Sequence, residues 1–262
     1  HVRSRRQRQM CIRDRRRTKE EVLKDLPKKT IQTVYCEQGE EEKKRYLSYH
    51  VALKSELEKS HDLGSIKFNM LQVLTKLRQA ASHLSLIENS SNVSSCKMEV
   101  LKELVSEIHD GGNKVIIFSQ FTRLLKLAQT SLKLDEMNSC YLDGKSRKRE
   151  DIIDKFKNSS DHNTFFISIK AGGFGLNLTN ANYCIILDPW WNPAVESQAI
   201  DRIHRIGQEK PVFAYRLLTK GSIEEKVDEL QKKKKDLYDK ILKNSEGFIR
   251  DLEKSDIEFL LQ

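Results

Sequence analysis

Two arginines and a glutamine in the second half of the chain have a spacing that suits phosphate binding. Gln198, Arg202 and Arg205 stand at positions i, i+4 and i+7 of a predicted helix. At about 100° per residue they fall within one narrow stripe. Guanidinium groups stay charged and match phosphate oxygens with paired hydrogen bonds, so this stripe predicts polyphosphate binding. In the alternative interpretation, Asp201 and Glu196 tie the arginines into surface salt bridges.

A glycine-rich segment, Lys170 to Leu178, is a second candidate for phosphate contact. It reads Lys-Ala-Gly-Gly-Phe-Gly-Leu-Asn-Leu and follows a predicted buried strand. Its glycines would allow positive φ angles and a close approach of the backbone to a phosphate. The spacing matches neither a P-loop nor a dinucleotide-binding fingerprint, and an ordinary glycine-rich turn is the alternative.

A third candidate is Ser119-Gln120, directly after another predicted strand. Backbone N–H groups and the helix dipole at the start of the following helix would favour a phosphate there. Serine is equally an ordinary N-cap residue, so both interpretations stay open.

The elements that would position these segments alternate between strand and helix. Short apolar runs without polar alternation predict strands buried on both faces, and their spacing predicts an α/β fold of the RecA-like type, with helices flanking a parallel sheet. Ligands of such sheets bind beyond the carboxyl ends of the strands, where all three candidate segments lie. The predicted strands cover 30–36, 115–118, 141–142, 164–169, 183–187 and 212–218.

Predicted helices come before, between and after these strands. Helical patterning covers 40–59 and 66–83, and Asn192 and Pro193 are typical residues to cap and open the helix that carries the arginines. In the tail, Ser222 with Glu225 forms a capping-box pattern. The lysine run 232–235 is typical of a solvated helix face, with a DNA-binding patch as the alternative.

Composition narrows the function class. The 262 residues include 38% hydrophobic and 32% charged residues, and no apolar run is long enough to span a membrane. Five cysteines stand 25 or more residues apart, so neither a zinc site nor a disulfide framework is expected, and a reducing compartment fits.

Net charge is a poor guide to nucleic-acid binding here. The formal charge is +9, but residues 1–17 hold eight arginines against one aspartate, which leaves only +2 for the rest. Residues 1–13 are unlike the remainder and are expected to be a non-native head segment. The charge balance of the chain therefore does not indicate DNA binding.

Longer motifs resemble the Swi/Snf family of superfamily-two ATPases. Residues 170–178, then Asp-Pro-Trp-Trp-Asn-Pro at 188–193 and Gln-Ala-Ile-Asp-Arg-Ile-His-Arg-Ile-Gly-Gln at 198–208, are similar to the family's motifs V and VI in order and spacing. Residues 114–125 resemble motif IV. Leu84 stands where the family often has proline, which we interpret as a tolerated loop change.

The resemblance implies one of two RecA-like lobes that close on ATP while gripping duplex DNA. Arg202 and Arg205 match the arginines that reach the γ-phosphate, and Gln198 matches a glutamine at the nucleotide. Gly173, Gly175 and Asn177 match the loop that couples nucleotide to DNA. The residues that match or adjoin positions facing the DNA backbone are Ser119, Gln120, Ser146, Arg149, Lys170 and Trp191.

The resemblance also implies what lies elsewhere. The chain contains no Gly-x-x-x-x-Gly-Lys-Ser/Thr and no Asp-Glu-x-His after an apolar strand, so the lysine that cradles ATP and the carboxylates that hold Mg²⁺ are expected on an N-terminal lobe. No metal site is expected in this lobe, and the chain alone is expected to be inactive.

The expected domain layout has four parts. After the head, residues 14–95 are expected to be a helical linker, 96–220 the RecA-like lobe and 221–262 a C-terminal helical brace. Expected partners are double-stranded DNA, the N-terminal lobe and a DNA-bound target such as RNA polymerase or a nucleosome, with no membrane. A bacterial cytoplasm is favoured over a nucleus.

Two other functions stay open. One is an RNA helicase or RNA-polymerase-recycling ATPase of the same superfamily, and the other is a non-catalytic nucleic-acid-binding module. A nucleoside-binding regulatory domain is more distant, because it needs no paired arginines.

Overall fold

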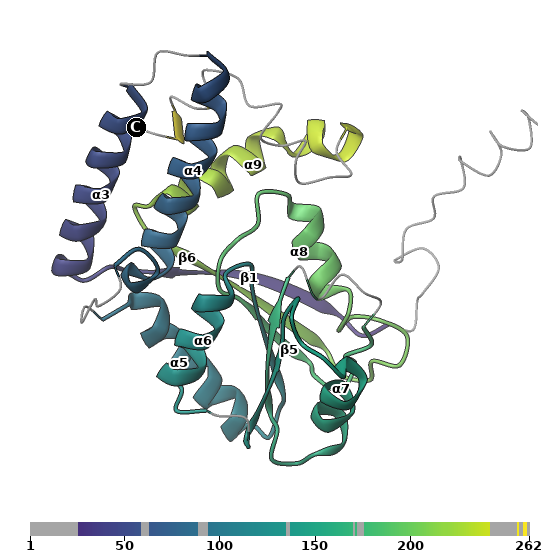
Figure 1. The fold of residues 1–262 in the computed structure, drawn as a ribbon. Helices are drawn as coiled ribbons and strands as arrows, with labels where there is room; N and C mark the ends of the chain where they lie inside the picture. The colour runs from purple at the N-terminus through teal and green to yellow at the C-terminus, as the bar shows by residue number, and fades with distance from the viewer. Residues whose placement is uncertain are drawn as a thin grey trace, which may run out of the picture.

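A six-stranded, wholly parallel sheet forms the centre of the molecule (Figure 1). The computed structural model describes residues 26–58, 63–88, 94–134, 137–169, 171, 176–241, 256 and 259–260. The strand order is β1-β6-β5-β2-β4-β3, which confirms the predicted parallel α/β fold. The strands are β1 Lys29–Cys36, β2 Val115–Ser119, β3 Ser139–Leu142, β4 Thr164–Ser168, β5 Tyr183–Ile186 and β6 Val212–Thr219.

Helices cover both faces of the sheet, with α5 and α6 on one face and α7 and α8 on the other (Figure 1). None of the helices within the described ranges is both long and apolar enough to cross a membrane. The helices are α3 Glu40–Glu58, α4 Leu63–Ser82, the 3-10 helix η1 Leu84–Leu86, α5 Cys96–Asp110, α6 Thr122–Ser131, α7 Arg149–Asn158, α8 Pro193–Ile200 and α9 Ile223–Ile241.

Side-chain alternation along the strands builds a separate core on each face. Ile116 and Phe118 of β2 pack with helices α4, α7, α8 and α9, whereas Val115 and Ile117 pack with α5 and α6. All four side chains are at most 1% exposed. Successive strand residues point to opposite faces, so a strand covered on both sides is apolar throughout, as the short apolar runs predict.

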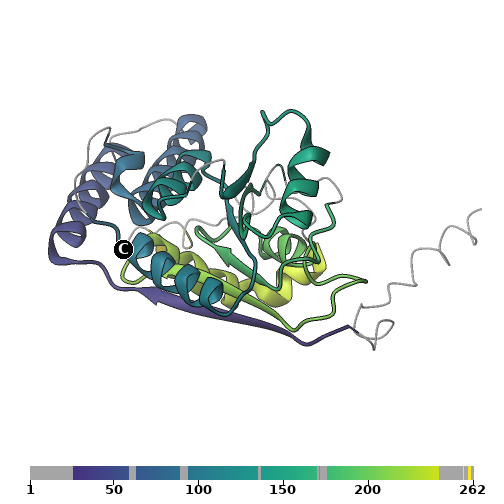
Figure 2. The same ribbon diagram turned by 90° about the horizontal axis from the view of Figure 1, so that it is seen from below.

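The lead-in segment contributes a strand as well as helices. β1 pairs with β6 along its whole length, from Lys29 opposite Val212 to Cys36 opposite Thr219. In the turned view β1 runs along one border of the molecule (Figure 2). The division of the chain at residue 95 stays a prediction, but strand β1 of the preceding segment belongs to the same sheet.

The start of α9 differs in detail from the capping-box prediction. The Ser222 hydroxyl accepts from the Glu224 N–H at 3.2 Å, and the Glu225 carboxylate accepts from the Gly221 N–H at 2.8 Å. Each bond therefore reaches one residue nearer the N-terminus than the pattern requires. Gly221 has a φ of +68°, which turns the chain so that its own N–H, rather than that of Ser222, faces the carboxylate.

Candidate functional site

The loops that follow β2, β4 and β5 meet at the carboxyl edge of the sheet. The Ile169 N–H donates to the Ser119 carbonyl at 3.0 Å. The Gln120 N–H donates to both carboxylate oxygens of Asp188, at 3.2 and 3.3 Å. These bonds join Ser119-Gln120 to the residue after β4 and to the loop after β5, directly beyond the strand ends, where parallel sheets bind ligands.

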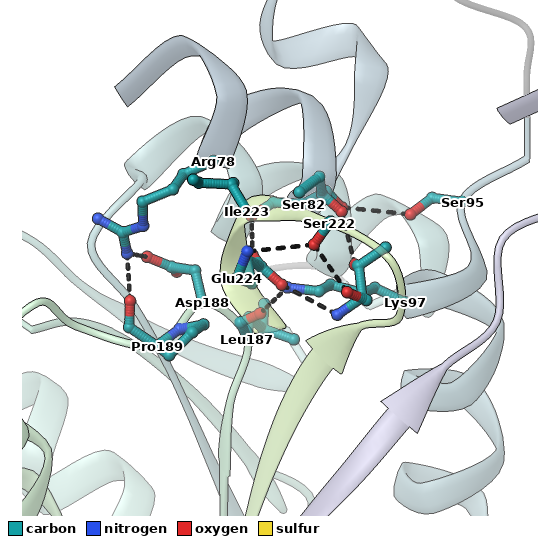
Figure 3. Close-up of polar contacts among 12 residues, drawn as sticks. Arg78, Ser82, Ser95, Lys97, Leu187, Asp188, Pro189, Ser222, Ile223 and Glu224 are labelled. Atoms are coloured by element: carbon teal, nitrogen blue, oxygen red, sulfur yellow. Dashed lines mark hydrogen bonds and ion pairs between the residues drawn. The ribbon is translucent and has the colours of Figure 1, made fainter. Parts of the chain in front are cut away.

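Asp188 faces a buried arginine that comes from helix α4. Nη2 of Arg78 lies 3.6 Å from a carboxylate oxygen of Asp188 and donates to the carbonyl of Pro189 (Figure 3). The Arg78 guanidinium also lies over the rings of Trp191 at 4.9 Å and Phe121 at 5.8 Å. Because Arg78 is 1% exposed and Asp188 is 0% exposed, each charge depends on the other.

Burial shapes the acid–base behaviour of this pair. Loss of solvent raises the pKa of Asp188 to about 6, although the positive charge of Arg78 and a hydrogen bond from Ser119 act in the opposite direction. Burial also lowers the pKa of Arg78, again against the attraction of Asp188. The pair is thus held together against a desolvation penalty, so its geometry has to be enforced by the surrounding fold.

A second buried ion pair ties helices α5 and α9 to the same edge. Nζ of Lys97 lies 2.6 Å from the carboxylate of Glu224 and donates to the Leu187 carbonyl at 2.7 Å (Figure 3). The same carboxylate accepts from the Ser82 hydroxyl at 3.1 Å and from the Thr219 N–H at 3.0 Å. Four separate segments therefore converge on one pair of fully buried charges.

Glu196 on α8 also holds the loop after β5 in place. One of its carboxylate oxygens accepts from the Trp190 N–H and the other from Nε of Arg216, both at 2.7 Å. Nε2 of Gln231 donates to the carbonyls of Trp190 and Trp191, also at 2.7 Å. Since both oxygens of Glu196 have these partners, Glu196 is not the surface carboxylate that would neutralise Arg202 or Arg205.

The helix predicted to carry the arginines is shorter than expected. Asn192 caps it as predicted, because its side-chain oxygen accepts from the Ala194 N–H at 2.9 Å. However, α8 ends at Ile200, and the chain continues in tight turns. The expectation of one helical stripe is therefore wrong for Arg202 and Arg205. Both follow the helix rather than lie on it, in a run dominated by i→i+3 backbone bonds.

A buried glutamine fixes those turns to the segment before β5. Nε2 of Gln208 donates to the carbonyls of Thr179, Ala181 and Ile203, at 3.1, 2.8 and 3.2 Å. Three carbonyls from two segments share one amide group, so the segments hold a fixed relative position.

Side chains around the Gln208 amide group differ in exposure to solvent. The Leu178 N–H donates to the Arg202 carbonyl at 3.1 Å, which places the end of the glycine-rich segment beside the turns. Asn177, Gln198 and Arg205 are exposed, and Arg202 is half-buried. The backbone is fixed while polar side chains face outward, an arrangement that suits contact with a polyphosphate supplied from outside this lobe.

Comparisons with known proteins now decide the family. The family described as "Helicase conserved C-terminal domain" matches residues 96–207. The C-terminal domain of the Sulfolobus solfataricus SWI2/SNF2 ATPase is 30% identical, with a TM-score of 0.70 over 88% of this chain and 97% of that one. The chain belongs to the Swi2/Snf2 family, as a C-terminal helicase lobe.

Other relatives place this Snf2 lobe within longer proteins. The Sulfolobus solfataricus SWI2/SNF2 ATPase core in complex with double-stranded DNA is 32% identical with a TM-score of 0.75, over 93% of this chain and 53% of that one. An ATP-dependent helicase of Mycoplasma genitalium is 36% identical over 239 residues, 90% of this chain and 23% of that protein. Protein CHROMATIN REMODELING 8 of Arabidopsis thaliana is also 36% identical, over 87% of this chain and 20% of that protein. The chain thus spans about a quarter or less of the curated relatives it matches.

The predicted DNA-facing residues of the Snf2 lobe are not all at its surface. Ser119 is fully buried, and its hydroxyl accepts from the Phe121 N–H at 2.9 Å. Trp191 is 5% exposed and packs against Arg78. In this conformation the side chains of Ser119 and Trp191 support the edge from inside, because neither is open to a ligand.

Other predicted contacts stand nearer the solvent. Gln120 is half-buried, and its Nε2 has no hydrogen-bond partner among the described residues. Ser146 is half-buried and accepts from the Asp143 N–H at 2.9 Å, and the half-buried Arg149 begins α7. Lys170, Gly173 and Gly175 lie outside the described residues, as do residues 1–25.

Except for Asp188, the residues that form the buried ion pairs of the Snf2 lobe do not belong to any recognisable sequence motif. Arg78 belongs to the repeat of Leu71, Leu74 and Leu77 at helical spacing, and an arginine at the buried end of an apolar stripe signals a partner inside the core. Lys97 gave no signal, since one lysine in a charged helix is ordinary. Its partner, Glu224, comes 127 residues later.

Proposed function

We propose that this chain is the second ATPase lobe of an ATP-dependent translocase on double-stranded DNA. In this proposal Arg202 and Arg205 act as arginine fingers toward ATP bound by the N-terminal lobe, with Gln198 and Asn177 beside the nucleotide. The observation that carries it is the exposed Arg205 on turns that Gln208 holds rigidly through three carbonyls. Because the backbone is already fixed, only the arginine side chain has to be ordered when it meets a phosphate.

The chemistry expected of the fingers is electrostatic. Phosphoryl transfer spreads negative charge over the equatorial oxygens, and a permanently charged guanidinium stabilises that charge by donating to them. Such fingers contribute about 10³–10⁵ in rate in other nucleotide hydrolases. Gly173 and Gly175, although outside the described residues, belong to the same proposed nucleotide-linked loop.

This lobe is not proposed to hold the metal. Within the described ranges, no group of three or more His, Cys, Asp or Glu side chains could hold a metal ion. The acidic residues of the carboxyl edge are instead committed to cations of the protein: Asp188 to Arg78, and Glu224 to Lys97. We therefore assign Mg²⁺ to the N-terminal lobe with ATP.

We assign contact with the DNA backbone to Gln120, Ser146, Arg149 and Lys170, and a positioning role to Ser119 and Trp191. The relative whose core was solved with double-stranded DNA supports duplex as the partner. Contacts to phosphates hold a protein on DNA without reading sequence, as movement along a duplex requires. The protein that is displaced or remodelled, RNA polymerase or a nucleosome among the candidates, is a matter for the whole protein.

The type of nucleic acid that stimulates ATP turnover can be tested with the chain fused to the N-terminal lobe of the Sulfolobus solfataricus relative. We expect duplex DNA to stimulate ATP turnover more than single-stranded RNA does. Greater stimulation by RNA would favour the RNA-helicase alternative, and nucleic-acid binding without stimulation would favour a binding module.

Relatives occur in Mycoplasma and in eukaryotes, and we propose the cytoplasm for a bacterial host.

A matched pair of α7 variants tests the DNA assignment. Arg149 begins α7 beyond the carboxyl end of β3, whereas Lys157 lies in its last turn. Arg149→Ala should weaken duplex binding and lower its salt dependence, because one phosphate contact is lost. Lys157→Ala removes the same charge at the other end of the helix. Equal losses in both variants would contradict the assignment.

A further inference from the structure

The residues that lead into β1 contact the turns that follow α8 (Figure 1). Residues 26–29 are called the entry segment here. Ring Nε2 of His204 donates to the Pro27 carbonyl at 2.7 Å, across 177 positions of sequence. Nζ of Lys29 lies 3.6 Å from a carboxylate oxygen of Asp201. Two contacts therefore join the entry segment to the turns that carry the proposed arginine fingers.

The histidine bond is the stronger of these two contacts. Because a carbonyl only accepts, Nε2 of His204 carries the hydrogen. Nδ1 of the same ring is buried and has no hydrogen-bond partner among the described residues, so the bond to Pro27 is what orients the ring. The side chains of Lys29 and Asp201 are 28% and 31% exposed, and water and salt screen such a pair.

The Pro27 carbonyl is a well-positioned acceptor. The proline ring fixes φ at this residue, which removes much of the freedom of the entry segment. At the next residue, the Val212 N–H donates to the Lys28 carbonyl at 2.9 Å, directly before the pairing of β1 with β6 begins. A displacement of the entry segment therefore reaches His204 through an acceptor that has little freedom of its own.

His204 directly precedes the exposed arginine of the turns. The His204 N–H donates to the Ile200 carbonyl at 2.9 Å, and the Arg205 N–H donates to the Ile203 carbonyl at 3.1 Å. On the other side of Arg205, Gln208 binds the segment before β5. Arg205 thus lies between two side-chain anchors that bind different segments, and a shift of either anchor changes where its guanidinium points.

We propose that His204 is a positioning residue, which couples the entry segment to the arginine fingers through the Pro27 carbonyl. This inference rests on the proposed function, in which the N-terminal lobe holds ATP. The matched part of the Sulfolobus solfataricus relative is its C-terminal domain, so the other lobe of that relative lies on the N-terminal side, ahead of the entry segment. The bond then helps to set the position of Arg205 relative to a nucleotide held by that lobe.

The main test uses the chain joined ahead of residue 26 to the N-terminal lobe of that relative, with saturating duplex DNA. His204→Phe keeps a planar ring and removes the donor. We expect kcat to fall about 10- to 100-fold, because a small misplacement of a catalytic group has effects of this size. KM for ATP should change less than about twofold, since the lost contact acts only in the transition state.

The conservative variant His204→Gln tests whether the donor itself matters. Its amide N–H reaches about as far as Nε2 of the imidazole, so it can still donate to the Pro27 carbonyl. We expect kcat within about threefold of the unmodified fusion, since the finger keeps its position. If His204→Gln is as impaired as His204→Phe, the donor has no role and the proposal is overturned.

His109→Phe is the matched control. His109 lies in the last turn of α5, is half-buried like His204, and its Nε2 is hydrogen-bonded to the Thr164 hydroxyl at 2.9 Å. The same ring substitution therefore removes a similar bond far from the arginine turns, and kcat should stay within about twofold. A loss as large as that of His204→Phe would show a general effect of the substitution and overturn the proposal.

Pro27→Gly tests the same bond from its other side, and it decides the matter if His204→Phe does not fold. Glycine keeps the carbonyl but frees φ, so the acceptor is less well positioned. We expect kcat to fall about threefold in the unmodified background and not at all in His204→Phe, where the bond is already absent. An unchanged kcat in Pro27→Gly alone, or losses that multiply in the double variant, would overturn the coupling.

Arg205→Ala in the same fusion separates this inference from the proposed function. If Arg205→Ala lowers turnover and His204→Phe leaves kcat unchanged, only the coupling through His204 is overturned. A raised KM with unchanged kcat in His204→Phe overturns it as well. If turnover is undiminished in Arg205→Ala, the arginine-finger assignment fails, and the positioning role fails with it.

Discussion

Two neighbouring segments at the carboxyl edge of the sheet use their polar groups in opposite ways. In the loop after β5, residues 188–192, the polar groups bind other parts of the lobe: Asp188 binds Arg78 and the Gln120 N–H, and Glu196 holds the Trp190 N–H. In the turns after α8, residues 201–208, the backbone is fixed by Gln208, while Arg205 faces outward.

The contrast separates residues that build the edge from residues that are free to act beyond it. Substitutions in the loop after β5 or its partners should mainly reduce stability, because they leave buried charges or carbonyls without a partner. Substitutions of exposed side chains in the turns should leave stability nearly unchanged and reduce turnover. Each prediction below is a test of that division.

The largest stability loss is expected from Arg78→Met. Removing the guanidinium leaves the fully buried carboxylate of Asp188 without its charge partner and the Pro189 carbonyl without its donor. Breaking a buried pair in this way costs about 3–5 kcal/mol. Urea unfolding followed by circular dichroism measures it. Arg123→Ala is the control, since Arg123 is exposed and, within the described ranges, donates only to the Ser85 and Leu86 carbonyls.

A smaller loss is expected from Gln208→Ala. Three backbone carbonyls then lose their shared donor, which costs about 1–3 kcal/mol in the free energy of unfolding. Hydrogen exchange should rise at 176–181 and 201–208 together, because one amide group joins them. If exchange rises in only one of the two segments, the clamp is not shared.

A pH effect of about 1 kcal/mol is expected from Asp188. Its pKa of about 6 exceeds the ordinary value of 3.8, so the folded chain binds this proton more tightly than the unfolded chain. Stability from this group therefore rises as pH falls from 8 to 5. Measured against Asp188→Asn, which cannot titrate, the wild-type chain should gain stability over that interval. A constant difference between the two chains would show that Asp188 keeps an ordinary pKa.

The smallest stability effect is expected from Gln198→Ala. Gln198 is exposed on α8, and alanine is a better helix former, so the free energy of unfolding should change by no more than about 0.5 kcal/mol. A loss comparable to that of Gln208→Ala would place Gln198 among the structural residues and blur the proposed division.

The central strands were predictable from sequence because both faces of the sheet are covered there, whereas most of the edge strand β1 is exposed or half-buried. Strands such as β2 and β4 are apolar except at their ends, and the predicted ranges differ from the observed ones by a residue or two. The end of α8 was not predictable in this way. The spacing of Gln198, Arg202 and Arg205 fits a helix. However, the Gln208 side chain binds the carbonyls of Thr179, Ala181 and Ile203, and this favours tight turns instead.

The buried pairs were also beyond the sequence pattern. Arg78 and Asp188 are more than a hundred residues apart, and only the packing of α4 over the loop after β5 brings them together. The motif residues Ser119 and Trp191 were found from sequence, but their burial was not. The type of a residue indicates what chemistry its side chain can do, whereas its exposure depends on which helix covers it in the fold.

The most direct test of the account is ATP turnover by the chain fused to the N-terminal lobe of the Sulfolobus solfataricus relative, with duplex DNA present. Arg205→Ala is compared with Lys210→Ala, which removes the same charge from an exposed position five residues away. We predict a loss of about 10³-fold or more for Arg205→Ala, with unchanged unfolding, and turnover near that of the unmodified fusion for Lys210→Ala. Undiminished turnover in folded Arg205→Ala would contradict the arginine-finger assignment.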